Sequence, residues 1–225
     1  MKITLWAGAL AALLVPFAPA AAQVPGRNGA SDMSAPGQGS ATAESFVAGN
    51  IAKSLAILNN AGLSEPQRRT QLEALLLSLT DSQRIATFTL GEYAKNTPQA
   101  DQDAFANAFQ NYSVAVYRSY FSRFAGQTLT VTGSSQRAPA DFIVSTKLQD
   151  PHDHSGQPPL EVDFRVRTDA GRPEITDLSV MGVWLALSQR DQFVSYLAAH
   201  SGSVPNLTAH ILEVTAQLGQ PPSDR

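Results

Sequence analysis

The apolar residues of this chain change their spacing after Gly126, and this change constrains the fold more than any other feature. Upstream, apolar residues recur every three or four positions, the spacing of one helical face, for example at Val47, Ile51 and Leu55. Downstream, residues 160–167 alternate apolar and polar side chains, the pattern of a strand with one covered face. Helices followed by strands predict an α+β domain rather than a doubly wound α/β fold.

About six helices are expected. Ser64 is a good N-cap for the second helix, with Gln67 as its capping-box partner. Thr97 caps the fourth helix, and Pro98 occupies its first helical position. The other helices are expected near residues 47–58, 81–93, 185–200 and 206–218.

About four strands follow the helical half, and we expect them to form an antiparallel sheet with helices on its apolar side. A turn at Asp169-Ala170-Gly171 predicts a hairpin between the last two strands. Such a layout can leave an apolar cavity between sheet and helices. The strands are expected near residues 128–132, 142–148, 160–167 and 174–181.

Aromatic side chains gather on and before the fourth helix. Nine of them fall within 37 residues, from Phe88 to Phe124. Core packing is the favoured explanation of such a stripe, and the excess of aromatic residues strengthens the alternative of a ligand pocket. Periodicity alone leaves both explanations open.

The ends of the chain have the composition of processed or flexible segments. Residues 1–22 read as a cleavable export signal, with Lys2 as the basic start and Ala20-Ala21-Ala22 as the small residues before the cut. A membrane anchor is the alternative. We expect a flexible leader at 23–43, an α+β domain at 44–219 and a disordered tail at 220–225.

Motifs of catalysis and of metal binding are scarce. The chain has no cysteine, which removes disulfides, thiolate metal sites and cysteine nucleophiles. No phosphate-binding loop and no hydrolase elbow stand between a strand and a helix. His152-Asp153-His154 could supply metal ligands, but nothing nearby completes a site, so a solvated turn is favoured. We therefore expect neither an enzyme nor a cofactor.

The charge balance argues against nucleic acid as a partner. Lys and Arg number 16 against 19 Asp and Glu, a formal net charge of -3, whereas nucleic acid requires a basic face.

Four charged residues share one face of the expected third strand: Glu161, Asp163, Arg165 and Arg167. A pocket floor with acid and base roles is conceivable. A charge ladder on the solvent side is favoured, because Val162, Phe164 and Val166 must face the helices.

Four motifs in order resemble the MlaC family, also called toluene-tolerance proteins, and their hopanoid-associated relatives. Residues 85–93 look like the family's helix that ends in Leu-Gly, and 105–131 like its F-x-x-x-F helix followed by Gly-Gln and a strand. Residues 174–183 resemble its Asp-bearing strand, and 190–193 match R-x-Q-F. The resemblance covers residues 47–211.

The resemblance implies a periplasmic carrier that holds the acyl chains of phospholipid, or of a hopanoid-type lipid, in a cavity between sheet and helices. It further implies two partners, an outer-membrane lipoprotein complex and an inner-membrane ABC transporter complex with its lipid-handling subunit, and a role in outer-membrane lipid asymmetry. The expected lining comprises Phe109, Tyr112, Val116, Tyr117, Tyr120, Phe121, Val144, Phe164, Val166, Val180, Trp184 and Phe193.

Two other functions stay open at this point. An enzyme of the isomerase or dehydratase type would place an ionisable side chain, with Asp163 as the candidate, inside the cavity. A pure docking module would carry nothing. Arg190 is expected to be structural, beside the carboxylate of Asp177.

Overall fold

The computed structural model describes residues 37–121, 127–150 and 158–218, with the backbone alone for 117–121. The helices are α2 (Gln38–Leu58), α3 (Glu65–Ser78), α4 (Ser82–Thr89), the 3-10 helix η1 (Gly91–Asn96), α5 (Gln99–Phe121), α6 (Leu185–Ala199) and α7 (Val204–Leu218). The strands are β1 (Thr128–Ala138), β2 (Asp141–Gln149), β3 (Glu161–Arg167), β4 (Glu174–Val180) and β5 (Val183–Trp184). The α+β class is confirmed.

The strands form one antiparallel sheet in the order β1-β2-β3-β4-β5. Residues that pair directly across strands share a face of the sheet. One such row runs across all five strands through Val131, Thr146, Val162, Val180 and Val183. This row lies on the apolar face of the sheet.

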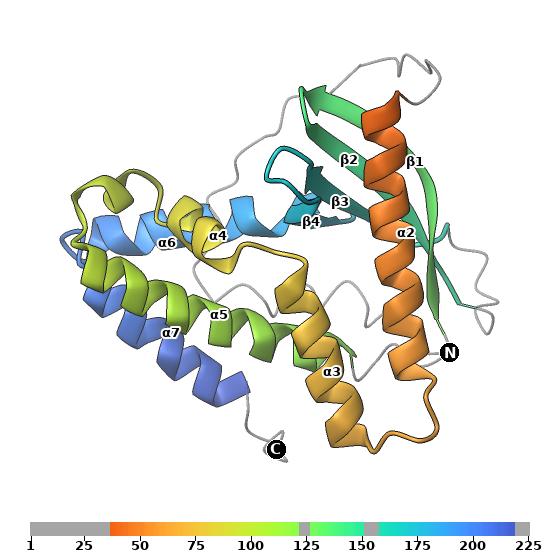
Figure 1. Ribbon diagram of the computed structural model, residues 1–225. Coiled ribbons are helices and arrows are strands. Elements are labelled where there is room, and N and C mark those ends of the chain that lie inside the picture. The colour runs from red at the N-terminus through yellow and green to blue at the C-terminus, as the bar shows by residue number, and fades with distance from the viewer. Residues whose placement is uncertain (1–36, 122–126, 151–157, 219–225) are drawn as a thin grey trace.

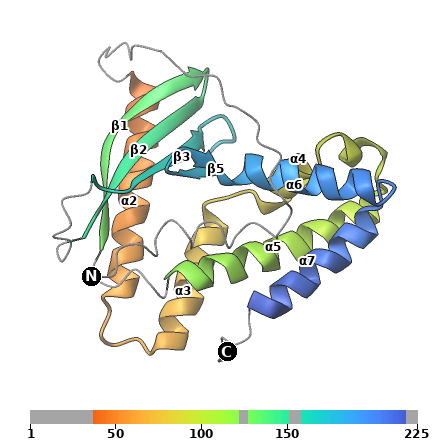
Figure 2. The same ribbon diagram turned by 180° about the vertical axis from the view of Figure 1, so that it is seen from behind.

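Helix α2 packs on that apolar face along β1 and β2, as Figures 1 and 2 show from opposite sides. Its Ala43 and Val47 are buried with Phe142, Val144 and Val166 of β2 and β3. We call this group the sheet cluster.

Helices α4, α5, α6 and α7 form a second layer, in which α5 and α7 run side by side with α6 and α4 beside them, while α3 contacts α2 (Figure 1). Phe105 is fully buried, and its ring centroid lies 6.1 Å from that of Phe109 and 5.7 Å from that of Phe193. Twelve buried residues from α4 to α7 make up this helical cluster. The described buried apolar residues thus form two main groups rather than one.

Strand β4 joins the two layers. Ile175 donates its backbone N–H to Leu79 O at 2.8 Å, at the junction of α3 and α4. In addition, Arg84 Nη1 of α4 lies 2.7 Å from Glu174 Oε1, and the Glu174 side chain is only 6% exposed. These contacts cover the backbone edge of β4 beyond the short β5, so this edge is not left free.

Local signals set the start of α3 as expected, whereas α5 begins at Gln99 and the Thr97 hydroxyl, expected to cap this helix, donates to Tyr93 O at 2.7 Å. Ser64 and Gln67 form both hydrogen bonds of the capping box at the start of α3, and Asp81 accepts from Arg84 N at the start of α4.

Three expectations need correction. The leader expected at 23–43 is wrong in its last part, because α2 begins at Gln38 and packs Ser40 and Ala43 against the sheet. The helix expected over 81–93 ends as an α-helix at Thr89, and a 3-10 helix follows from Gly91, which has a φ of 61°. The sheet gains a fifth strand of two residues, too short for periodicity to reveal.

The expected export signal, the rest of the leader, the tail and His152-Asp153-His154 lie outside the described residues.

Candidate functional site

The predicted lining residues divide between the two clusters. Phe109, Tyr112, Val116 and Phe193 belong to the helical cluster. Val144 and Val166 belong to the sheet cluster, and Phe164 packs against it. Val180 and Trp184 are half-buried and belong to neither. The side chains of Tyr117, Tyr120 and Phe121 lie outside the described part of the chain.

Burial separates the residues that can face a ligand from those that support them. Val144 and Val166 have 0% of their surface exposed, so they touch no space that a water molecule can enter. Phe164 and Val180, on the same face of the sheet, keep part of their surface exposed. The two buried valines therefore support this surface from within the core, and a ligand would reach them only if their neighbours moved.

Sequence reasoning missed four half-buried apolar residues on the same face: Leu129, Val131, Leu148 and Leu178. The alternation of β1 and β2 contains them. Only the register shows that they continue the surface of Phe164 and Val180, because cross-strand pairing cannot be read from one strand alone.

Burial along the row that crosses the five strands is greatest at Thr146 of β2 and falls from there toward β5. Val131 packs against the sheet cluster below α2. Val162 is 8% exposed, Val180 is half-buried, and Val183 at the far edge is 47% exposed. Thr146, the one polar member, donates its hydroxyl to Val162 O at 2.7 Å. The row is therefore an apolar surface that opens toward β5.

Polar groups beside the helical cluster are few, and two of them, Gln189 Nε2 and Gln192 Oε1 of α6, are buried without a hydrogen-bond partner among the described residues. The Tyr112 hydroxyl donates to Gln189 Oε1 of α6 at 3.3 Å. Thr89 donates to Ala86 O at 2.7 Å. The first contact joins α5 to α6, and the second lies within α4.

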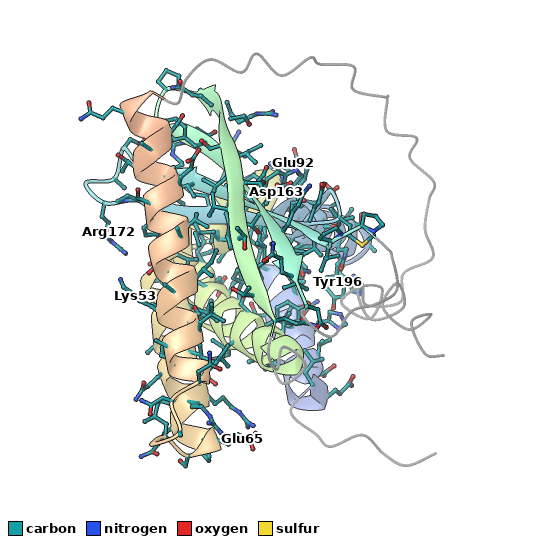
Figure 3. The ribbon with its side chains drawn as sticks, turned by 90° about the vertical axis from the view of Figure 1, so that its right-hand side faces the viewer. Lys53, Glu65, Glu92, Asp163, Arg172 and Tyr196 are labelled. Carbon is teal, nitrogen blue, oxygen red and sulfur yellow. The ribbon has the colours of Figure 1, made fainter. Side chains whose placement is uncertain are left out.

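The opposite face of the sheet carries the charged residues, as expected. Arg165 holds Asp141 by two hydrogen bonds of 3.0 and 2.6 Å, which raise the pKa of the guanidinium. Arg167 pairs with Asp169 in the following turn. Asp163 lies on the side of the sheet away from α2 (Figure 3). The strand faces therefore confirm a charge ladder, and Asp163 does not face the apolar surface.

Asp177 is a half-buried carboxylate with a structural role. Its Oδ1 accepts from Leu178 N and from Ala186 N, both at 2.8 Å. Burial raises the pKa of this carboxyl, while these backbone donors and Arg165 act in the opposite direction. The carboxylate thus fixes the first turn of α6 to β4.

Arg190 does not occupy the position expected for it. Its guanidinium carbon lies 5.0 Å from the ring centroid of Phe88, and this stacking is the contact that the structure gives it. The backbone of α6, rather than Arg190, holds Asp177. Asp177 accepts from Ala186 N in the first turn of α6, whereas Arg190 lies one turn further along this helix.

Within the described ranges no group of three or more His, Cys, Asp or Glu side chains could hold a metal ion. Among the same residues, no helix has the length and apolar character needed to cross a membrane.

Comparison with known proteins agrees with this architecture. The structure of a phospholipid-binding protein from Ralstonia solanacearum, in complex with a phospholipid, superposes with a TM-score of 0.68 at 20% sequence identity. The match covers 79% of this chain and 99% of that protein. At this identity the likeness shows the fold. The family model described as MlaC protein matches residues 49–213, well over half of the sequence. The chain therefore belongs to the MlaC family.

Proposed function

We propose that this protein is a lipid carrier that binds the acyl chains of a phospholipid between the apolar face of its sheet and its helical layer. Membership of the MlaC family and the fold shared with a phospholipid-binding protein support lipid binding. Both favour binding and transport over catalysis.

One observation on this chain carries the proposal: half-buried apolar side chains follow one another on one face of the sheet, beside the fully buried members of the sheet cluster. Leu129, Val131 and Leu148 lie on β1 and β2, and Leu178 and Val180 on β4. A monomeric protein gains stability by covering such a surface. An acyl chain can cover it, because each methylene group removed from water contributes about 0.8 kcal/mol.

The cellular role follows from the same proposal. The export signal expected at residues 1–22 would deliver the carrier to the periplasm. There it would move lipid between an outer-membrane lipoprotein complex and an inner-membrane ABC transporter complex. Because acyl chains are costly to expose to water, a carrier for this path needs an apolar surface and little polar chemistry.

The test is the lipid content of the protein. The full-length chain is expressed in a bacterium that exports it, purified without detergent, and analysed by native mass spectrometry followed by lipid extraction. We expect one phospholipid or hopanoid-type lipid for each protein molecule. A folded protein that is repeatedly empty, and that takes up no lipid from mixed micelles, would overturn the proposal.

A matched pair of variants locates the lipid. Val180→Asn places an amide on the apolar face, whereas Ile143→Asn places the same amide on the charged face, and both parent side chains are half-buried. We expect lipid occupancy to fall at least about fivefold in Val180→Asn, because an unpaired amide against hydrocarbon is costly. Ile143→Asn should keep the occupancy of the wild type. Equal occupancy in the two variants would contradict the location.

A further inference from the structure

The turn between β4 and β5 carries apolar side chains into solvent. Met181 is 67% exposed, Val183 is 47% exposed, and Leu187 in the first turn of α6 is 46% exposed. Trp184 between them is half-buried. Figure 2 shows that β5 leads directly into α6, so these residues belong to one continuous corner of the molecule. We call them the β5 corner.

The backbone of the corner holds Met181 outward. Met181 and Gly182 have φ values of 52° and 82°, the left-handed region that a two-residue hairpin requires at both central positions. Asn or Asp followed by Gly is the usual choice there. A large apolar side chain at such a position is uncommon, and here it stands at the most exposed point of the hairpin.

The corner also lacks charge. From Leu178 to Gln189 the sequence contains no Asp, Glu, Lys or Arg. The charged groups on either side in sequence are directed elsewhere: Asp177 holds the first turn of α6, and Arg190 stacks on Phe88. Across the sheet, the exposed Glu161, whose backbone oxygen accepts from Met181 N at 3.1 Å, belongs to the charged face. A partner recognised by charge therefore does not fit this surface.

The corner is continuous with the proposed lipid surface. Val183 pairs with Val180, and Val180 pairs with Val162. The row through these residues reaches Val131 below α2. An acyl chain entering at the corner would therefore meet Val183 and Val180 first, with the buried Val162 beside them.

We propose that the β5 corner is where the protein inserts into the surface of a lipid bilayer to take up or release its cargo. This inference rests on the proposed function. The corner is a small convex tip, whereas a stable protein interface buries roughly 800 Å² on each partner over a complementary surface. A soft apolar medium accommodates such a tip without a matching shape. Tryptophan at this place suits the bilayer interface, where an apolar ring and a polar N–H are both satisfied.

The fluorescence of Trp184 can report contact between the β5 corner and a bilayer. The sequence contains two tryptophans, Trp6 and Trp184, so a Trp6→Phe change leaves Trp184 as the one reporter. The protein is mixed with vesicles of phosphatidylcholine, which carry no net charge. Bound protein is separated by flotation, and the Trp184 emission is recorded with and without brominated acyl chains. We expect flotation, a blue shift, and quenching by the bromines, all insensitive to salt, because no charge attraction is involved.

A double variant and a matched control test the residues. Met181→Ser with Leu187→Ser should lower the vesicle-bound fraction about tenfold, because two exposed apolar side chains are lost. Leu212→Ser removes a leucine that is also 46% exposed, but on α7, and should leave vesicle binding unchanged. All the replaced side chains are exposed, so circular dichroism should show folded variants.

Three outcomes would overturn the inference. They are a wild type that does not float with vesicles, a double variant that floats as well as Leu212→Ser, and a corner-dependent dimer detected by sedimentation, which would make a second copy the occupant. The lipid content of the purified protein separates this inference from the proposed function. A protein that carries lipid but does not float keeps the carrier function and loses the bilayer contact.

Discussion

The apolar side chains of the helical cluster have almost no exposed surface, whereas on the sheet burial falls from the central strands toward β5. Phe105 of α5 is fully buried between Phe109 and Phe193. On the sheet, Phe164 and Val180 retain exposed surface although they lie on the covered face.

This difference separates the aromatic residues that stabilise the fold from those that can contact a ligand. A packed ring loses its contacts when it is truncated, and a cavity remains. A half-exposed ring has fewer contacts to lose, and a ligand can add to them. The aromatic stripe of α5 is therefore core as far as its side chains are described, and the candidate binding surface lies mainly on the sheet.

The largest expected effect comes from truncating one phenylalanine in each region. Phe105→Ala should lower the free energy of unfolding by about 3–5 kcal/mol, as for a buried aromatic residue. Phe164→Ala should cost clearly less stability and reduce lipid occupancy. Urea unfolding and native mass spectrometry of both variants measure the two effects. If Phe164→Ala costs as much stability as Phe105→Ala, the two regions do not differ as described.

A smaller effect is expected at the joint between the layers. Arg84→Ala leaves the carboxylate of Glu174, whose side chain is 6% exposed, without its cation. We expect a loss of about 1–3 kcal/mol in the free energy of unfolding. The control is Arg69→Ala, which breaks an exposed pair with Glu65 on α3 and should cost less than about 0.5 kcal/mol. If both variants lose a similar free energy of unfolding, the Arg84–Glu174 pair does not stabilise the joint more than an exposed ion pair does.

Asp177 should contribute about 1 kcal/mol through its hydrogen bonds to the start of α6, so Asp177→Ala should lose that amount. Asp177→Asn keeps an oxygen acceptor and should lose little. Because burial raises the pKa of Asp177 above 3.8, the folded state binds its proton more tightly than the unfolded state does. This contribution to stability is complete below pH 3.8 and is lost as the pH rises through the folded pKa. Relative to wild type, Asp177→Asn should therefore gain stability between pH 3 and pH 7. If the difference in free energy of unfolding between the variant and the wild type stays constant over that pH range, the pKa of Asp177 is not raised in the folded state.

The smallest effect concerns two glycines of α2. A Cβ on Gly39 would lie 2.6 Å from Cζ of Phe142, whereas one on Gly49 would meet nothing within 4 Å. Gly49→Ala should add about 0.5–1 kcal/mol to the free energy of unfolding, from helix propensity alone. Gly39→Ala should lower it, because Phe142 is buried and has little room to move. Thermal unfolding distinguishes the signs, and a stabilised Gly39→Ala would show that α2 does not pack on the sheet as described.

Much of the fold could be predicted from local signals. The capping box at Ser64 and the alternation of residues 160–167 act within a few residues of the chain, so the sequence displays them directly. The start of α2 was missed because residues 38–43 are poor in large apolar side chains. Tertiary packing against Phe142 makes them helical, and sequence periodicity does not show such packing.

The candidate site was harder to predict, because burial and register are properties of several strands together. Val144 and Val180 have the same pattern in sequence, yet one is fully buried below α2 and the other is half-exposed near β5. Arg190 was placed beside Asp177 on charge alone, whereas the backbone of α6 supplied the nearer donors. Hydrogen bonds from nearby backbone N–H groups thus satisfy Asp177 in place of an ion pair with Arg190.

The most direct test of the binding surface is a nuclear Overhauser experiment between protein methyl groups and a bound phospholipid. The protein is deuterated except for its Ile, Leu and Val methyl groups, and it is loaded with protonated lipid. We predict contacts from acyl methylenes to Val131, Leu148 and Val180, and none to Ile143 on the charged face. Contacts to Ile143, or bound lipid without contacts to the apolar face, would contradict the account.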